Sequence, residues 1–77
     1  MCETLAVIPL GKEAEVRAIL TPEPIRNRLN ELGLTVGCRV RCIYAAACGD
    51  PRAYLVRGTV LAIRNRDARC IEVKTWD

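Results

Sequence analysis

Residues 54–63 read Tyr-Leu-Val-Arg-Gly-Thr-Val-Leu-Ala-Ile, two short apolar runs joined by Arg57 and Gly58. Short runs of apolar and β-branched residues are typical of strands. Gly58 can adopt the positive φ angle that a two-residue hairpin turn requires. The stretch therefore predicts a tight β-hairpin with one strand at 54–56 and the other at 59–63.

Two further strands are predicted before this hairpin, because apolar and polar residues alternate there. In residues 14–20 the apolar residues that share one face are Ala14, Val16, Ala18 and Leu20. From Arg39 onward, the residues that share one face are Val40, Cys42 and Tyr44. A last short strand is expected at 70–73, after a polar or helical turn at 65–69.

One short helix is expected between the first two strands. Its apolar stripe, at positions i, i+4 and i+7, is formed by Ile25, Leu29 and Leu32. Thr21 is a candidate N-cap, Pro22 suits a first helical position, and Gly33 supplies a left-handed residue that ends the helix. Five short strands and one helix at this spacing favour a small closed or nearly closed barrel, a single domain over residues 1–77.

Composition narrows the function classes. The 77 residues are 51% hydrophobic with no Phe, so the core must be aliphatic. The net charge is +3, and the basic residues are spread along the chain without interleaved aromatics, which argues against nucleic acid as the partner. There is no His and no residue set for nucleophilic catalysis, so we expect that the protein is not an enzyme. No apolar run is long enough to cross a bilayer, so no direct membrane insertion is expected.

The five cysteines suggest reduced thiols in a cytoplasmic protein, because the chain shows no signal peptide. Cys38 and Cys42 are separated by about 13 Å on a flat strand at about 3.3 Å per residue, too far for a shared metal ion or a disulfide. Cys42 and Cys70 could face each other across neighbouring strands, or could act as small buried hydrophobes. Cys48 lies beside the turn at 49–51 and is expected to be an exposed loop thiol.

The remaining candidate residues are for docking. Arg39, Arg41 and Arg57 are expected on solvent faces or turns, where they form either a solvated polar face or a basic docking surface. Leu34 lies on the connection after the predicted helix. It either plugs the end of the barrel or belongs to an apolar patch that meets a partner.

The run Arg28-Leu29-Asn30-Glu31-Leu32-Gly33-Leu34-Thr35-Val36-Gly37 resembles the FeoA family, the small cytoplasmic component of bacterial ferrous-iron uptake. The resemblance continues in order and spacing through Leu10-Gly11, Gly49-Asp50-Pro51 and Gly58 to Val73, nearly the whole chain. The sequence departs from the family pattern at Val36, where Pro is frequent, and in its cysteine content.

The resemblance implies an SH3-like barrel with an inserted helix and no required cofactor. It implies a non-catalytic accessory protein that docks on the cytoplasmic GTP-binding domain of the membrane ferrous-iron transporter and modulates transport. The surface near Leu34, Arg39, Arg41 and Arg57 is the predicted contact. The alternative is a module related to the C-terminal domain of metal-dependent repressors, which binds Fe²⁺ or Zn²⁺ through Cys42, Cys70 and Cys48.

Overall fold

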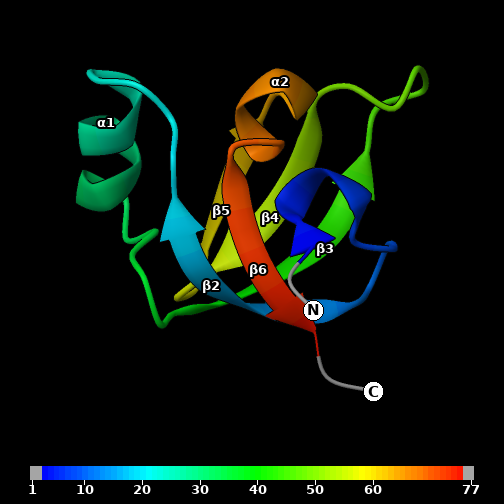
Figure 1. Cartoon of the computed structure of the whole chain (residues 1–77). Helices are drawn as coiled ribbons and strands as arrows, with labels where there is room; N and C mark the ends of the chain where they lie inside the picture. The colour runs from blue at the N-terminus through cyan, green and yellow to red at the C-terminus, as the bar shows by residue number, and fades with distance from the viewer. Residues whose placement is uncertain (1–2, 76–77) are drawn as a thin grey trace.

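The computed structural model describes residues 3–75. Its elements in chain order are β1 (Glu3–Thr4), the 3₁₀ turn η1 (Leu5–Val7), β2 (Glu13–Ile19), α1 (Ile25–Glu31), β3 (Arg39–Ala45), β4 (Arg52–Val56), β5 (Thr59–Ile63), α2 (Asn65–Ala68) and β6 (Ile71–Thr75). The fold is mainly β, as predicted, although it contains six strands and a second short helix (Figure 1).

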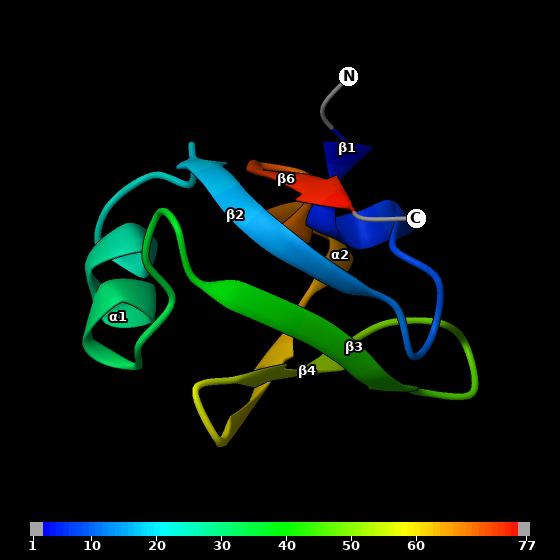
Figure 2. The ribbon, with the colours of Figure 1, turned by 90° about the horizontal axis from the view of Figure 1, so that it is seen from below.

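All strand pairs are antiparallel, and the single sheet has the order β1-β6-β2-β3-β4-β5. Its end strands β1 and β5 do not pair with each other within residues 3–75, so the barrel-like sheet is not closed. Helix α1 stands outside the sheet, beside the end of β2 and the start of β3 (Figure 2).

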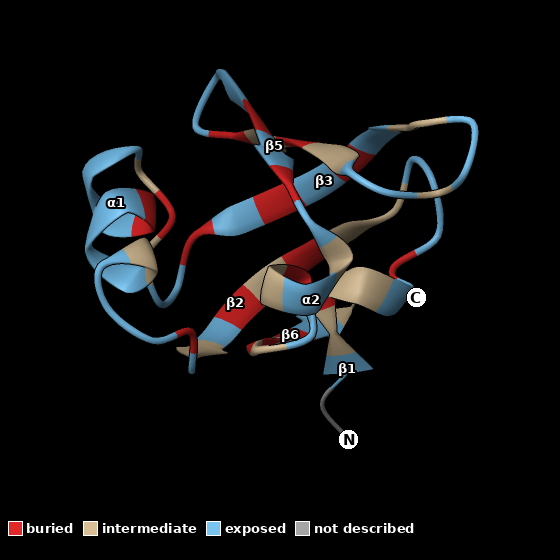
Figure 3. Ribbon diagram, turned by 90° about the horizontal axis from the view of Figure 1, so that it is seen from above, coloured by how far each residue is buried: buried red, intermediate tan, exposed pale blue. Residues whose placement is uncertain are grey.

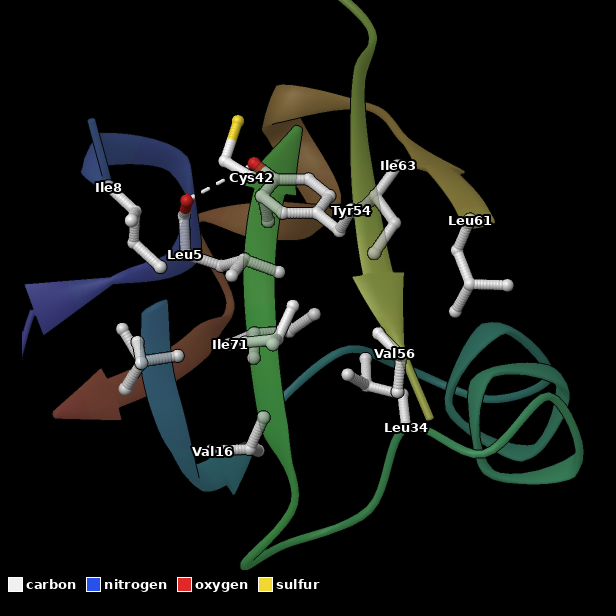
Figure 4. Close-up of a cluster of buried hydrophobic side chains, with 14 of the residues drawn as sticks. Leu5, Ile8, Val16, Leu34, Cys42, Tyr54, Val56, Leu61, Ile63 and Ile71 are labelled. Carbon is white, nitrogen blue, oxygen red and sulfur yellow. Dashed lines mark hydrogen bonds between the residues drawn. The ribbon is translucent and has the colours of Figure 1, made fainter. Parts of the chain in front are cut away.

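Buried and exposed residues alternate along the strands, which places one face of each strand against a common core (Figure 3). The core is aliphatic, as composition required, and Tyr54 is its largest fully buried side chain. Ile71 and Val16 contribute from β6 and β2, while Val56 and Ile63 contribute from β4 and β5 (Figure 4).

The hairpin predicted at 54–63 is present. Arg57 and Gly58 have φ angles of 51° and 81°, so both turn residues are left-handed, as a type I′ turn requires. Val56 faces Thr59 directly across the turn, and the register continues without a break to the far end of β5. The strand β4 begins at Arg52, two residues earlier than the sequence pattern indicated.

Strand β2 follows the predicted alternation only over its first half. Ala14 and Val16 are fully buried, but Leu20 is 62% exposed, so its predicted place on the inner face is wrong. The pairing of β2 with β6 shifts register between Val16 and Ala18. A bulge of this kind exchanges the two faces beyond it, which is why Ile19 packs against the core instead.

In β3 a second bulge makes the predicted inward position of Tyr44 wrong. Val40 and Cys42 are buried as expected, whereas Tyr44 is 63% exposed. The register between β3 and β4 shifts between Cys42 and Tyr44, and this shift turns the Tyr44 side chain outward.

Helix α1 begins later than predicted and has seven residues, with Pro24 at its N-cap. The predicted cap, Thr21, is buried, and its hydroxyl has no hydrogen-bond partner within residues 3–75. A cap at Thr21 would accept from the N–H of residue 23 or 24, and the second of these is a proline without an N–H. Of the predicted stripe, Leu29 is buried, Ile25 is half-buried and Leu32 is 42% exposed.

The predicted turn at 65–69 is the helix α2, and the last strand is β6, where Ile71 and Val73 face the core as expected. The sequence pattern did not predict β1 and η1. They bring Leu5 and Ile8 into the core, where both are fully buried.

Candidate functional site

The predicted docking residues Arg39 and Arg41 lie on the outer face of β3, at the positions that alternate with buried Val40 and Cys42. Both arginines are exposed. Arg41 faces Glu13 across the β2–β3 pair, with 3.8 Å between its guanidinium nitrogen and Oε2 of Glu13. The outer face of β3 is therefore a charged surface that solvent and partners can reach.

Arg57 occupies the β4–β5 turn and is exposed. A β-carbon at Gly33 would lie 3.6 Å from Cδ of Arg57, so the stem of this side chain covers the residue that ends α1. The turn thus brings Arg57 next to the C-terminus of α1, where a positive charge is favourable.

Leu34 is fully buried and cannot contribute its side chain to a docking surface, which corrects that part of the prediction. Its backbone N–H donates to the carbonyl of Leu29, and the N–H of Gly33 donates to that of Asn30. These two bonds form a Schellman motif, and they direct Leu34 back against buried Leu29. Leu34 is therefore the plug at this end of the barrel.

The three candidate thiols are not brought together. Cys42 is fully buried on β3, and its carbonyl accepts from the N–H of Gly11, near the start of β2. Cys70 lies at the other end of that strand, where its carbonyl accepts from Leu20. Cys48 is exposed, and its thiol donates to the carbonyl of Asp50 at 3.0 Å.

Within residues 3–75, no group of three or more His, Cys, Asp or Glu side chains could hold a metal ion. The described cysteines are all free, and Cys2 lies outside the described residues. The residues present therefore do not fit a thiol-bound zinc or iron ion, which needs several sulfurs at about 2.3 Å.

A part-buried polar cluster around Arg52 on β4 was not predicted from the sequence. Its guanidinium donates to the carbonyls of Ala6 and Ile8 and, at 2.9 Å, to the thiol sulfur of Cys42. The same guanidinium lies 5.6 Å from the ring centroid of Tyr54. The one signal in the sequence that could have indicated this role is the position of Arg52, a single charged residue between the Asp50-Pro51 turn and an apolar strand.

Tyr54 completes the cluster. Its hydroxyl donates to the carbonyl of Leu5, and the close-up shows this bond above the aliphatic core (Figure 4). Burial raises the pKa of Tyr54 to about 12, against the opposing effect of the Arg52 charge. Arg52 and Tyr54 together bind residues 5–8 to the barrel, so the cluster stabilises the fold.

Within residues 3–75 no helix is both long and apolar enough to cross a membrane. The interior is filled by side chains, so the chemistry that the described residues offer to a partner lies on the exterior.

Comparison with known proteins agrees with this arrangement. A protein-family model for the FeoA domain matches residues 3–75. No curated protein sequence matches the chain. The solution structure of a FeoA protein from Chlorobium tepidum shares 30% identity, with a TM-score of 0.92 over 96% of this chain and 70% of that one.

The crystal structure of Stenotrophomonas maltophilia FeoA in complex with zinc shares 31% identity, with a TM-score of 0.81 over 92% of this chain and 88% of that one. That protein is described as a procaryotic SH3 domain protein and is proposed as a ferrous iron transport activating factor. The fold is also shared with IdeR of T. acidophilum, at 20% identity and a TM-score of 0.85, where it covers 34% of that chain.

The fold predicted from the sequence, a small SH3-like barrel, is thereby confirmed. This chain belongs to the FeoA family, and its role is in ferrous iron transport.

Proposed function

We propose that this chain is a non-catalytic accessory protein that acts in the cytoplasm, docks on the GTP-binding domain of the membrane ferrous-iron transporter and modulates transport. The docking surface is the outer face of β3 together with the β4–β5 turn, and it carries Arg39, Arg41 and Arg57. Family membership supports the transporter as the partner.

The observation that carries the proposal is the contrast between the two faces of β3. On the inner face, Val40 and Cys42 are buried in the core, out of reach of a partner. On the outer face, Arg39 and Arg41 are exposed at neighbouring positions. Arginine is enriched in protein interfaces because its planar guanidinium pairs with carboxylates in a defined geometry.

Titration of the purified GTP-binding domain into the full chain, followed by calorimetry, tests this function. We expect the triple variant Arg39→Glu, Arg41→Glu, Arg57→Glu to bind at least about tenfold more weakly, since charge reversal turns attraction into repulsion. The control is Arg69→Glu, which changes an exposed arginine that follows α2.

Circular dichroism must first show that both variants are folded. Equal affinity of the triple variant and the parent would remove this surface from the mechanism. Complete absence of binding by the folded parent would remove the docking function itself.

A further inference from the structure

Strand β5 is an open edge of the sheet. It pairs with β4 on one side, and within residues 3–75 no strand pairs with its other side. Its sequence, Thr-Val-Leu-Ala-Ile over residues 59–63, contains no charged residue and no proline. Proteins usually protect an edge strand with such residues, because unpaired backbone groups invite another strand.

The type of turn decides which backbone groups face outward. In a hairpin closed by a two-residue turn, the flanking residues Val56 and Thr59 form a hydrogen-bonded pair, and such pairs alternate with non-bonded ones along the ladder. The N–H and C=O groups of Val60 and Ala62 therefore point away from β4, toward the open side of the strand.

A groove runs along this open edge, between β5 and α1, and has a volume of about 540 Å³. On the α1 side its apolar wall is formed by Ile25, Leu29 and Leu32. On the β5 side Leu61 lies next to α1 (Figure 4). A five-residue strand is about 16 Å long at about 3.3 Å per residue, so the groove offers an extended segment both backbone partners and apolar contacts.

The charge around the groove is positive. Arg28 of α1 lines it, as do Arg64 and Arg66, which follow β5, and Asp67 is its one acidic residue, giving 3 − 1 = +2. All three arginines are exposed, and none of them forms an ion pair with another of residues 3–75. The groove is thus complementary to carboxylates.

We infer that this groove binds an extended segment of a partner protein, in which acidic residues alternate with apolar ones, by adding it as a strand to β5. Main-chain bonds to Val60 and Ala62 supply affinity, and the arginines select acidic side chains. This inference goes beyond the docking surface on β3, and it does not depend on which protein carries the segment.

Two other occupants fit less well. A second copy of this chain would offer the groove its own β5, whose residues 59–63 carry no carboxylate to pair with the arginines. Single-stranded nucleic acid is usually held by stacking on aromatic side chains, and the described residues that line the groove include none.

The test is an NMR titration of the full chain with the blocked heptapeptide acetyl-Glu-Val-Glu-Val-Glu-Val-Glu-amide. We expect shifts centred on β5 and α1, and hydrogen exchange of the Val60 and Ala62 amides slowed at least about tenfold at saturation. The same peptide with Lys in place of Glu tests charge. The Glu peptide with N-methyl groups on alternate amides tests strand pairing, because it loses main-chain donors.

Two variants complete the design. Arg28→Glu with Arg64→Glu is expected to weaken binding at least about tenfold, whereas Arg17→Glu, an exposed arginine on β2, changes it less than about twofold. Ala62→Pro removes an outward N–H and keeps the bonds of β5 to β4, since proline is tolerated at such edge positions. It is also expected to weaken binding at least about tenfold.

The inference is overturned if the shifts map elsewhere, if the N-methylated or Lys peptide binds as well as the Glu peptide, or if the double charge reversal binds like the parent. It is also overturned if the free chain dimerises through β5, or if a thymidine oligonucleotide binds the groove as tightly. Should Ala62→Pro unfold the chain, the N-methylated peptide decides.

The outcome is separable from that of the proposed function. If the GTP-binding domain binds the Arg28→Glu, Arg64→Glu variant normally and the Glu peptide does not bind the parent, the groove fails and docking stands. If the Glu peptide binds and the GTP-binding domain does not, the groove stands and docking fails.

Discussion

The hydroxyl of Tyr54 donates a 3.1 Å hydrogen bond to the main-chain carbonyl of Leu5, 49 residues earlier in the chain. Both residues are fully buried, so this bond satisfies two polar groups in an aliphatic environment. It ties the N-terminal turn η1 to strand β4, which lies between β3 and the edge strand β5.

Tyr54→Phe is expected to lower the free energy of unfolding by about 1–3 kcal/mol, because the buried carbonyl of Leu5 then keeps only the long 3.4 Å bond from the N–H of Ile8. Urea unfolding followed by circular dichroism measures the change. The matched control is Tyr44→Phe, which removes an exposed hydroxyl and should change stability by less than about 0.5 kcal/mol. Equal effects of the two substitutions would contradict the role of the Tyr54 bond.

Stability should depend on pH in the alkaline range because of the same side chain. The folded protein raises the pKa of Tyr54 from 10.0 to about 12, so it favours the protonated phenol. The stabilisation is fully present below pH 10 and is lost as pH rises toward 12. Urea midpoints at pH 8, 10 and 11.5 should fall more steeply for the parent than for Tyr54→Phe. Parallel curves would show that Tyr54 is not responsible.

Arg52→Met is expected to detach residues 5–8 from the barrel, because Ala6 and Ile8 lose their shared guanidinium donor. Hydrogen bonds to a charged group are worth about 1.5–3 kcal/mol each, so we expect a loss of at least that size. Hydrogen exchange should rise first in η1 and in the start of β2. Arg64→Met, at an exposed arginine, is the control.

Leu34→Ala tests the assignment of Leu34 as a plug. Truncation of a fully buried leucine is expected to lower stability by about 2–5 kcal/mol through the cavity that it leaves. Val36→Ala, two residues away and 64% exposed, should change stability by less than about 0.5 kcal/mol. If the two variants proved equally stable, Leu34 would not be part of the core.

Gly33→Ala should be destabilising by about 1–2 kcal/mol, because Gly33 has a φ angle of 103° that a β-carbon disfavours. Thermal unfolding measures the effect. Asn30→Ala on the exposed face of α1 is the control, and it should be neutral or slightly stabilising because alanine favours the helix. A stable Gly33→Ala variant would contradict the Schellman geometry.

Local patterns in the chain predicted most elements of this fold. The Arg57-Gly58 turn, the strand around Val40 and the helix end at Gly33 depend on the backbone preferences of one or two residues and on alternation over a few neighbours. These effects are short-range, so they can be predicted from the sequence. The composition alone likewise predicts an aliphatic core, and it excludes any site built on His because the chain contains none.

The candidate site was predictable only in part. Exposure of Arg39, Arg41 and Arg57 follows from alternation and turn chemistry, and the structure agrees. Leu34 was misplaced as a docking residue, since burial of a residue after a helix depends on what packs over it. The groove at β5 could not be predicted from the sequence, because it forms where α1 lies opposite an edge strand.

The sequence by itself determined the β4–β5 turn, the central residues of the longer strands and the C-terminal end of α1, because φ preferences and apolar spacing act within a few residues. Tertiary structure decided the rest. Bulges in β2 and β3 turned Leu20 and Tyr44 outward, since register is set by the partner strand. Arg52 reached the backbone of residues 6 and 8 only after the barrel brought segments more than 40 residues apart together, a long-range contact that no local pattern encodes.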